Sequence, residues 1–214
     1  MIVSDQVVSK MAKSENPSKG ELTRQMIVAA AAPIFNQKGY EGCSLADLMA
    51  ATGLQKGGIY RHFSSKEELA AAAFDYNCEV SRSARMALVD QAAPPLERLR
   101  QSIAAFVDYR SPVPGGCPIL NTAVESDDGN GVLRARASKA VRGWVGRIQA
   151  MVQDAIDQGQ IRKEVDAKSV ATVIVAALEG AAMMNRLERN EYGLRQVQQH
   201  LYRYLDSELA PGEK

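Results

Sequence analysis

Apolar residues recur at helical spacing along most of this chain. A first helix is expected from about residue 21 to residue 38, ending at Gly39, because apolar side chains fall at i, i+3 and i+4. Its apolar face consists of Ile27, Ala30, Ala31, Ile34 and Phe35. Pro33 lies inside this pattern and predicts a kink, since proline removes a helical hydrogen bond.

The same periodicity predicts further helices separated by polar or proline- and glycine-rich loops. Their expected ranges are about 45–52, 56–63, 66–92, 95–109, 117–126, 132–158, 166–189 and 194–209. Loops are expected at 111–116 and 127–131, where proline, glycine, aspartate and asparagine cluster. No segment shows the alternation that is typical of a strand. The chain is therefore predicted to be all-α, with about nine helices.

Residues 44–63, SLADLMAATGLQKGGIYRHF, are the most informative stretch. Ser44 can cap the first of two short helices, with Asp47 as its capping-box partner. Gly53 can end that helix in the left-handed conformation. The second helix then turns Ile59 and Phe63 inward at i, i+4. This is the pattern of a helix-turn-helix, whose second helix enters the major groove of DNA.

The outer side of that second helix carries most of the residues that we expect to contact DNA. Its charged and polar side chains suit phosphate oxygens, and its two glycines permit a close approach. The expected DNA-binding residues are Arg24, Ser44, Gln55, Lys56, Gly57, Gly58, Tyr60, Arg61, His62 and Lys66. The alternative is a packed three-helix cluster that does not bind DNA.

The helix-turn-helix belongs to a longer set of motifs. They are Ile27…Ala31…Phe35…Gly39-Tyr40, Ser44-Leu45-Ala46-Asp47-Leu48, Ala51-Thr52-Gly53-Leu54, Lys56-Gly57-Gly58-Ile59-Tyr60-Arg61-His62-Phe63 and Ser65-Lys66-Glu67-Glu68-Leu69. Together they resemble the DNA-binding domain of the TetR/AcrR family of bacterial transcriptional regulators, over about a fifth of the chain. Gln55 departs from this pattern, because many relatives carry Ser or Thr there as a helix cap. Glutamine caps poorly, so its side chain is expected to reach a base instead.

Charge is distributed unevenly along the chain. Residues 1–66 hold 8 Lys and Arg against 5 Asp and Glu, a net of +3, whereas residues 67–214 hold 18 against 20, a net of −2. Nucleic-acid binding requires a basic excess at the reading domain. We therefore expect a flexible tail at 1–20, with Met11 as an alternative start, a DNA-binding domain at 21–66, and a ligand-binding and dimerisation domain at 67–214.

The three cysteines, Cys43, Cys78 and Cys117, show no metal-binding spacing, and only two histidines are present. No metal, cofactor or disulfide framework is expected, and a reducing cytoplasm is the natural setting. The N-terminus lacks the apolar core of a signal peptide. The most apolar stretch, 170–184, is too short to span a membrane, so no membrane association is expected.

That stretch, 170–184, is instead expected to form a homodimer interface. It has 12 apolar residues out of 15, on every side of a helix, and such a helix must be buried all round. The last helix has one apolar stripe, formed by Leu194, Val197, Leu201, Tyr204 and Leu205. The family resemblance implies a dimer through these two helices of each subunit. The alternative is a central core helix in a monomer.

The resemblance also implies a small-molecule pocket in the C-terminal domain. The candidate lining residues are Phe106, Tyr109, Cys117, Asn121, Glu125, Trp144, Ile148, Met183 and Met184. Asn121 and Glu125 lie at i, i+4 on the short helix and share a face with Cys117. Simple core residues or surface residues are the alternatives. Cys117 stands at a helix start, which favours a thiolate, so a thiol sensor is a further alternative.

The leading functional hypothesis is a ligand-responsive repressor that binds a palindromic operator as a dimer and is released by a small molecule. The long helix after Lys66 is, by resemblance, its mechanical link. A regulator without a ligand, or a sensor acting through Cys117, are the alternatives. An enzyme is not expected, because the sequence has no Ser/His/Asp set, metal cluster or phosphate loop.

Overall fold

The computed structural model of the protein describes residues 17–109 and 111–211. Within these ranges the chain forms nine α-helices, α2 to α10, one short π-helical segment, η1, and no strand. The prediction of an all-α fold is therefore confirmed. The expected tail falls mostly outside the described residues.

The described residues form two compact units. The first contains the residues up to Ser83 together with Ser111–Ser138, and the second contains those of Ala84–Arg110 and Lys139–Lys214. The domain boundary expected after residue 66 lies inside the first unit, because residues 67–83, α7 and the first turns of α8 pack with the helix-turn-helix region. The unit that contains the helix-turn-helix thus includes a later segment of the chain, Ser111–Ser138.

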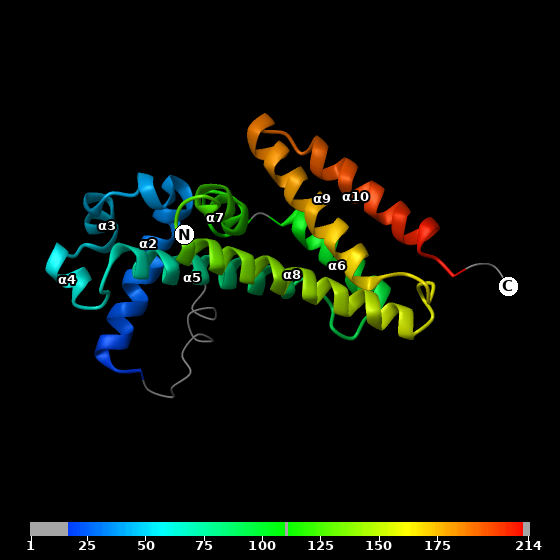
Figure 1. The fold of residues 1–214 in the computed structure, drawn as a ribbon. Coiled ribbons are helices and arrows are strands. Elements are labelled where there is room, and N and C mark those ends of the chain that lie inside the picture. Colours follow the sequence, from blue (N-terminus) through cyan, green and yellow to red (C-terminus); the bar gives the residue numbers. More distant parts are fainter. Residues whose placement is uncertain (1–16, 110, 212–214) are drawn as a thin grey trace. The chain divides into compact units, whose positions relative to one another are not determined.

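The first unit is built from α2 (Lys19–Gly42), α3 (Leu45–Thr52), α4 (Lys56–Tyr60), most of α5 (Lys66–Met86), α7 (Pro118–Ser126) and the start of α8 (Gly131–Asp157) (Figure 1). Its helices bury one continuous apolar cluster. Members of this cluster are Ile27, Ala31, Phe35, Leu48, Ile59, Phe63, Leu69 and Leu133. The predicted apolar face of the first helix contributes Ile27, Ala31 and Phe35 to it.

The first helix behaves largely as its sequence predicts. Ser18 caps α2 in a capping box with Glu21. The non-helical residue inside α2 is Gly39, which has φ 77° and ψ 175°, and not Pro33. A proline has a helical φ, so Pro33 removes one hydrogen bond without breaking the helix. The predicted helix end at Gly39 is a kink, after which α2 continues to Gly42, and the dihedral angles show no kink at Pro33, where the sequence predicted one.

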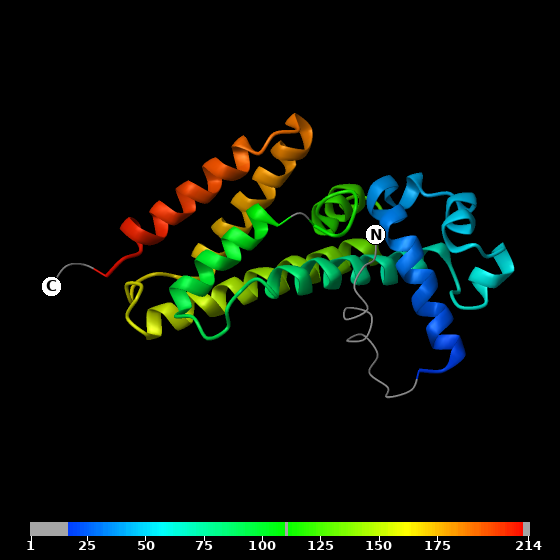
Figure 2. The ribbon, with the colours of Figure 1, turned by 180° about the vertical axis from the view of Figure 1, so that it is seen from behind.

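The second unit consists of α6 (Pro95–Asp108), the rest of α8, α9 (Ala167–Glu188), α10 (Tyr192–Arg203) and η1 (Tyr204–Glu208). Figures 1 and 2 both show α9 and α10 lying side by side. Its core includes the residues Leu99, Ile103, Phe106, Val152, Ile174, Leu178, Leu201 and Leu205. Phe106 stacks on Trp144 with ring centroids 5.2 Å apart, and the Arg85 guanidinium lies 4.3 Å from the Phe106 centroid.

Helix α5 ends at Met86, although the sequence pattern predicted a helix to about residue 92. The Asp90 carboxylate accepts a hydrogen bond from the Ala92 N–H at 2.9 Å, and the Gln101 side chain accepts one from the Asp90 N–H at 2.8 Å. Asp is one of the residues whose side chain competes in this way with helical bonding. The helix therefore gives way to turns before the proline pair at 94–95 is reached.

Helix α9 buries one face, whereas its sequence is apolar all round. Ala167, Val170, Ala171, Ile174, Val175, Leu178 and Ala181 are buried in the core of the second unit. On the opposite side Val173, Met183, Met184 and Leu187 are 49%, 47%, 45% and 74% exposed. The whole helix, with 22 residues, is longer than the apolar stretch 170–184 and could cross a membrane by length and composition alone. A single helix of this kind is weak evidence for a membrane protein, because the core helix of a soluble protein has the same length and composition.

Candidate nucleic-acid interface

The first helix of the helix-turn-helix, α3, is held at both ends. Ser44 Oγ accepts the Asp47 N–H at 3.1 Å, and Asp47 Oδ2 accepts the Ser44 N–H at 2.9 Å. Lys38 Nζ lies 2.6 Å from Asp47 Oδ1. The hydrogen bond from Lys38, followed by those from Ser44, lowers the pKa of the Asp47 carboxyl to about 2. The predicted capping box is confirmed, and the Ser44 hydroxyl is engaged in it.

The turn after α3 is fixed by backbone and side-chain hydrogen bonds. Gly53 has φ 69°, and its N–H donates to the Met49 carbonyl at 2.9 Å, as the sequence predicted for a left-handed cap. Thr52 Oγ1 donates to the Leu48 carbonyl at 2.7 Å and accepts the Leu54 N–H at 3.3 Å. The two helices of the motif are therefore joined by a turn with little freedom.

Gln55 occupies the N-cap position of α4 but makes no side-chain capping hydrogen bond. Its residue is exposed. This agrees with the expectation that glutamine caps this helix poorly. Its side-chain amide is therefore not used to cap the helix and is available to contact a partner molecule.

Helix α4 and the residues just after it turn one side into the core and the other outward. The helix ends at Tyr60, with Arg61 as its C-cap, and does not reach residue 63 as the sequence pattern predicted. Ile59 and Phe63 are 1% and 2% exposed, as predicted, whereas Lys56, Gly57 and Arg61 are exposed. A Cβ placed on Gly57 would meet no atom within 4 Å, whereas one on Gly58 would lie 3.4 Å from Leu54 Cβ. The small size of Gly57 is therefore not required by the packing of its own chain.

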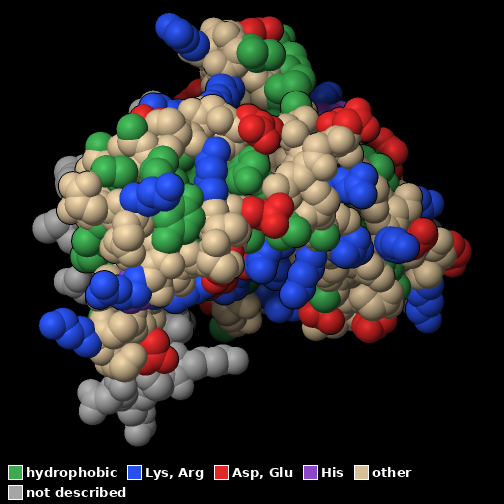
Figure 3. Space-filling model, turned by 60° about the vertical axis from the view of Figure 1, so that its left-hand side comes forward, with side chains coloured by type: hydrophobic (Ala, Val, Ile, Leu, Met, Phe, Trp, Pro, Cys, Tyr) green, Lys and Arg blue, Asp and Glu red, His purple; other side chains and the backbone are tan. Residues whose placement is uncertain are grey.

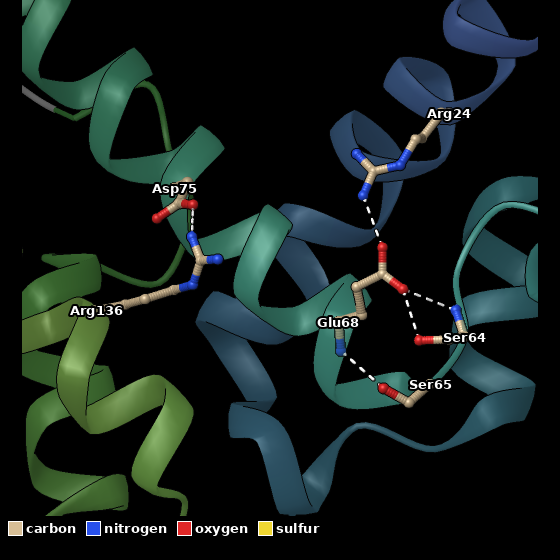
Figure 4. Close-up of polar contacts among 6 residues, drawn as sticks. All are labelled: Arg24, Ser64, Ser65, Glu68, Asp75 and Arg136. Atoms are coloured by element: carbon tan, nitrogen blue, oxygen red, sulfur yellow. Dashed lines mark hydrogen bonds and ion pairs between the residues drawn. The ribbon is translucent and has the colours of Figure 1, made fainter.

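Arg24 and Lys66, two of the predicted DNA-binding residues, make contacts within the first unit. The Arg24 guanidinium lies 4.4 Å from the Phe63 ring centroid, and its Nη2 lies 2.9 Å from Glu68 Oε1 (Figure 4). Lys66 Nζ lies 4.5 Å from the Tyr40 ring centroid. Both cations are thereby oriented by aromatic rings, an arrangement that the sequence analysis did not foresee.

Glu68 links three segments of the first unit, as Figure 4 shows. Its Oε2 accepts the Ser64 N–H and hydroxyl, each at 2.8 Å, and Ser65 Oγ accepts the Glu68 N–H at 3.0 Å. The Ser64 hydrogen bonds, with a further one from Arg24, lower the pKa of the Glu68 carboxyl to about 2. The segment after α4, at Ser64 and Ser65, is thus fixed to the start of α5. Asp75 and Arg136 form a further ion pair between α5 and α8.

Positive charge is dispersed rather than gathered in one patch on the face drawn in Figure 3. Lys and Arg side chains lie there in several groups, with carboxylates and apolar side chains between them. Binding of an anionic partner would therefore rely on particular positions, such as those on α4.

Among the described residues no group of three or more His, Cys, Asp or Glu side chains could hold a metal ion.

The residues expected to line a ligand pocket are divided between the two units. Cys117, Asn121 and Glu125 belong to the first unit, while Phe106, Tyr109, Trp144, Ile148, Met183 and Met184 belong to the second. Phe106 and Ile148 are core residues, and Trp144 packs against that core. Met183 and Met184 lie on the exposed side of α9. Their role in ligand binding stays a prediction.

Asn121 and Glu125 do share one face of α7, but they find protein partners there. Asn121 Nδ2 donates to the Asn36 carbonyl at 3.0 Å, and Glu125 accepts the backbone N–H groups of Tyr40 and Glu41. Glu125 also lines a cavity of about 20 Å³, whereas small-molecule sites are typically several hundred Å³. The hydrogen-bond partners of these two side chains therefore lie at the end of α2.

Two family models match the chain and together cover both units. The N-terminal model, described as bacterial regulatory proteins of the TetR family, matches residues 27–73. The model described as the tetracyclin repressor-like C-terminal domain matches residues 95–201. The chain belongs to the TetR family. The resemblance inferred from residues 23–69 is therefore confirmed, and TetR-family proteins are transcriptional regulators with a helix-turn-helix.

Solved structures of TetR-family regulators match over nearly their whole length. One from Chloroflexus aurantiacus is 43% identical, with a TM-score of 0.85, and the match covers 91% of this chain and 99% of that one. Another, from Cytophaga hutchinsonii, is 34% identical, with a TM-score of 0.86, and covers 93% and 100%. The "HTH-type transcriptional repressor DhaR" of Mycobacterium sp. strain GP1 is 29% identical over 81% of this chain and 87% of that protein.

Proposed function

We propose that this TetR-family regulator is a cytoplasmic repressor that binds a near-palindromic operator as a homodimer and is released by a small molecule. It acts by binding and not by catalysis. The observation that carries the proposal is that Ile59 of α4 is buried while Lys56, Gly57 and, just after the helix, Arg61 are exposed. The likeness to a protein named as a transcriptional repressor supports the direction of regulation.

The outer side of α4 suits a DNA groove. Gly57 leaves an open approach to the helix backbone, and Lys56 and Arg61 supply charge on either side of it. At the N-terminal end of the helix, the Gln55 side chain makes no capping hydrogen bond. In a helix-turn-helix, residues at this end contact base edges, while neighbouring cations contact phosphates.

The exposed side of α9 supports a dimer. Val173, Met183, Met184 and Leu187 extend along one side of the helix, opposite its buried face. A helix that is apolar on both sides is stable in water only when the second side is also covered. A second copy of α9 provides a matching apolar surface, and a two-fold dimer places two recognition helices about 34–36 Å apart, on successive major grooves.

The release step needs an effector that binds one conformation of the protein better than another. We place its site in the second unit, where Phe106 and Trp144 form an aromatic stack. Titration of candidate metabolites against an operator complex, followed by fluorescence anisotropy, identifies such an effector by the release of DNA. A regulator without a ligand would keep its operator at every concentration.

DNA binding itself is tested first, with the wild-type protein and a random-sequence duplex library. Selection should enrich a near-palindromic sequence. Lys56→Ala should then weaken binding to it and lower the slope of log affinity against log salt by about 1, since one phosphate contact is lost. Lys163→Ala, at an exposed lysine in the second unit, is the matched control and should change neither quantity. The proposal fails if no sequence is enriched, or if Lys56→Ala behaves like the control.

A further inference from the structure

The last turn of α2, which follows the kink at Gly39, is held by a carboxylate from far along the chain. Glu125, on α7, accepts the Tyr40 N–H on Oε2 at 2.8 Å and the Glu41 N–H on Oε1 at 3.0 Å. Gly39, with φ 77°, makes room for it, because a Cβ there would lie 2.5 Å from Glu125 Oε1. An L side chain at position 39 would be strained by its backbone and would collide with the carboxylate.

A second set of hydrogen bonds reinforces this contact one turn earlier on both helices. Asn121 Nδ2 donates to the carbonyls of Asn36 and Gly115, at 3.0 and 2.9 Å. Asn36 is only 7% exposed, and its Nδ2 donates to the carbonyls of Pro114 and Gly116, at 2.7 and 3.1 Å. The C-terminal end of α2 is therefore fixed to α7 and to the loop before it, all within the first unit.

The turn that Glu125 holds lies between residues of the candidate DNA surface. The Tyr40 ring supports the ammonium group of Lys66, with Nζ 4.5 Å from the ring centroid. Immediately before the turn, Lys38 pairs with Asp47 of α3, and shortly after it Ser44 caps the same helix. A shift of the turn would therefore move both the Lys66 ammonium group and the start of α3.

We propose that Glu125 is a positioning residue for DNA binding, whose carboxylate holds the last turn of α2 in the conformation that presents α3, α4 and Lys66 to the operator. Glu125 acts through the Tyr40 and Glu41 N–H groups and does not touch DNA itself. This inference rests on the function proposed above and adds to it a residue outside the helix-turn-helix.

Electrostatics alone predicts the opposite sign from positioning. Removing a negative charge from a DNA-binding unit should strengthen binding to a polyanion. Loss of two hydrogen bonds to a charged acceptor should instead loosen the turn and weaken operator binding, on the order of tenfold. Because Glu125 makes no phosphate contact, the salt-dependence slope should stay unchanged.

Glu125→Gln and Glu125→Ala are compared with Asp128→Asn, which removes an exposed negative charge three residues further on. Each variant is assayed by fluorescence anisotropy against the operator selected with the wild type. Tyr40 and Glu41 N–H exchange is followed by NMR, and thermal melting and light scattering report on folding and assembly. Both Glu125 variants should lose operator affinity, and these two amides should exchange faster, while the control binds at least as tightly as the wild type.

The outcomes separate this inference from the proposed function. If the wild type selects no operator, the proposed function fails before the variants are assayed. If the wild type binds and both Glu125 variants bind equally well or more tightly, the positioning role is overturned. A loss of affinity without faster exchange of the two amides overturns it too. If Glu125→Ala melts early, Glu125→Gln, which keeps the size of the side chain, provides the decisive comparison.

Discussion

Substitution of Gly57 should change stability and DNA affinity in opposite directions. In the free protein, Gly57→Ala adds a methyl group that meets no atom within 4 Å. Alanine is favoured over glycine in a helix by up to about 1 kcal/mol, so the free protein should become slightly more stable. On DNA, the same methyl group would occupy the space into which a base edge or phosphate must fit.

The size of each effect follows from the local structure. Gly57 lies in the first turn of the five-residue helix α4, so the gain should be a fraction of the helix-interior value. For a chain of this length a gain of about 1 kcal/mol would raise the melting temperature by about 2–4 °C, which sets the upper limit. Operator affinity should fall by about tenfold for alanine, the equivalent of roughly 1.4 kcal/mol, and further for valine.

The assay pairs thermal melting with anisotropy titrations on the operator selected by the wild type. Gly146→Ala is the matched control, because Gly146 is an exposed glycine within α8 where a Cβ would also meet no atom within 4 Å. It should share the gain in stability and leave DNA binding unchanged. Gly58→Ala should gain less, since its Cβ would lie 3.4 Å from Leu54 Cβ.

A Gly57→Ala protein that binds its operator as tightly as the wild type would refute the reasoning. DNA would then not approach this part of α4 closely. A loss of affinity that Gly146→Ala shares would also refute it, because the cause would lie in the helix propensity and not in the interface.

Three further outcomes are expected. Leu187→Asp should reduce the mass in light scattering from about twice 23.2 kDa toward a single chain, whereas Leu88→Asp, at another exposed leucine, should not; equal masses for both would exclude α9 from the interface. The Glu68 carboxyl has a pKa lowered from 4.5 to about 2, so its ionised form stabilises the fold above pH 4.5, and this contribution is lost as the pH falls toward 2. The urea midpoint of the Glu68→Gln protein should therefore decline less than that of the wild type between pH 4.5 and pH 2. Cys117, at the start of α7, should react with iodoacetamide faster than Cys43, whose pKa is raised by burial; equal labelling rates by mass spectrometry would mark it as structural.

Sequence alone determined the helices and the helix-turn-helix. These features depend on interactions between residues close in the chain. The Ser44–Asp47 capping box, the left-handed Gly53 and the inward Ile59 and Phe63 all involve residues no more than four positions apart. Local signals of this kind are readable without knowledge of the fold.

Competing hydrogen bonds account for the end of α5, which the sequence pattern placed at about residue 92 and the structure places at Met86. Helical periodicity continued past Met86, but the hydrogen bonds of Asp90 to Ala92 and Gln101 favoured a turn. The bond from Ala92 is short-range and was visible in principle as an Asp before a proline pair. The bond with Gln101 required knowledge of where α6 packs.

Only the tertiary structure decided what the polar residues of α7 contact. Asn121 and Glu125 were recognised as sharing a face, yet their partners lie 84 to 85 residues earlier in the chain. The same holds for Arg24, which was expected to bind DNA and whose partner, Glu68, lies 44 residues away. Helical spacing fixes which side chains point the same way, but it carries no information about what approaches that face. That depends on how the whole chain packs around its apolar residues, and this packing places α7 in the same compact unit as the helix-turn-helix.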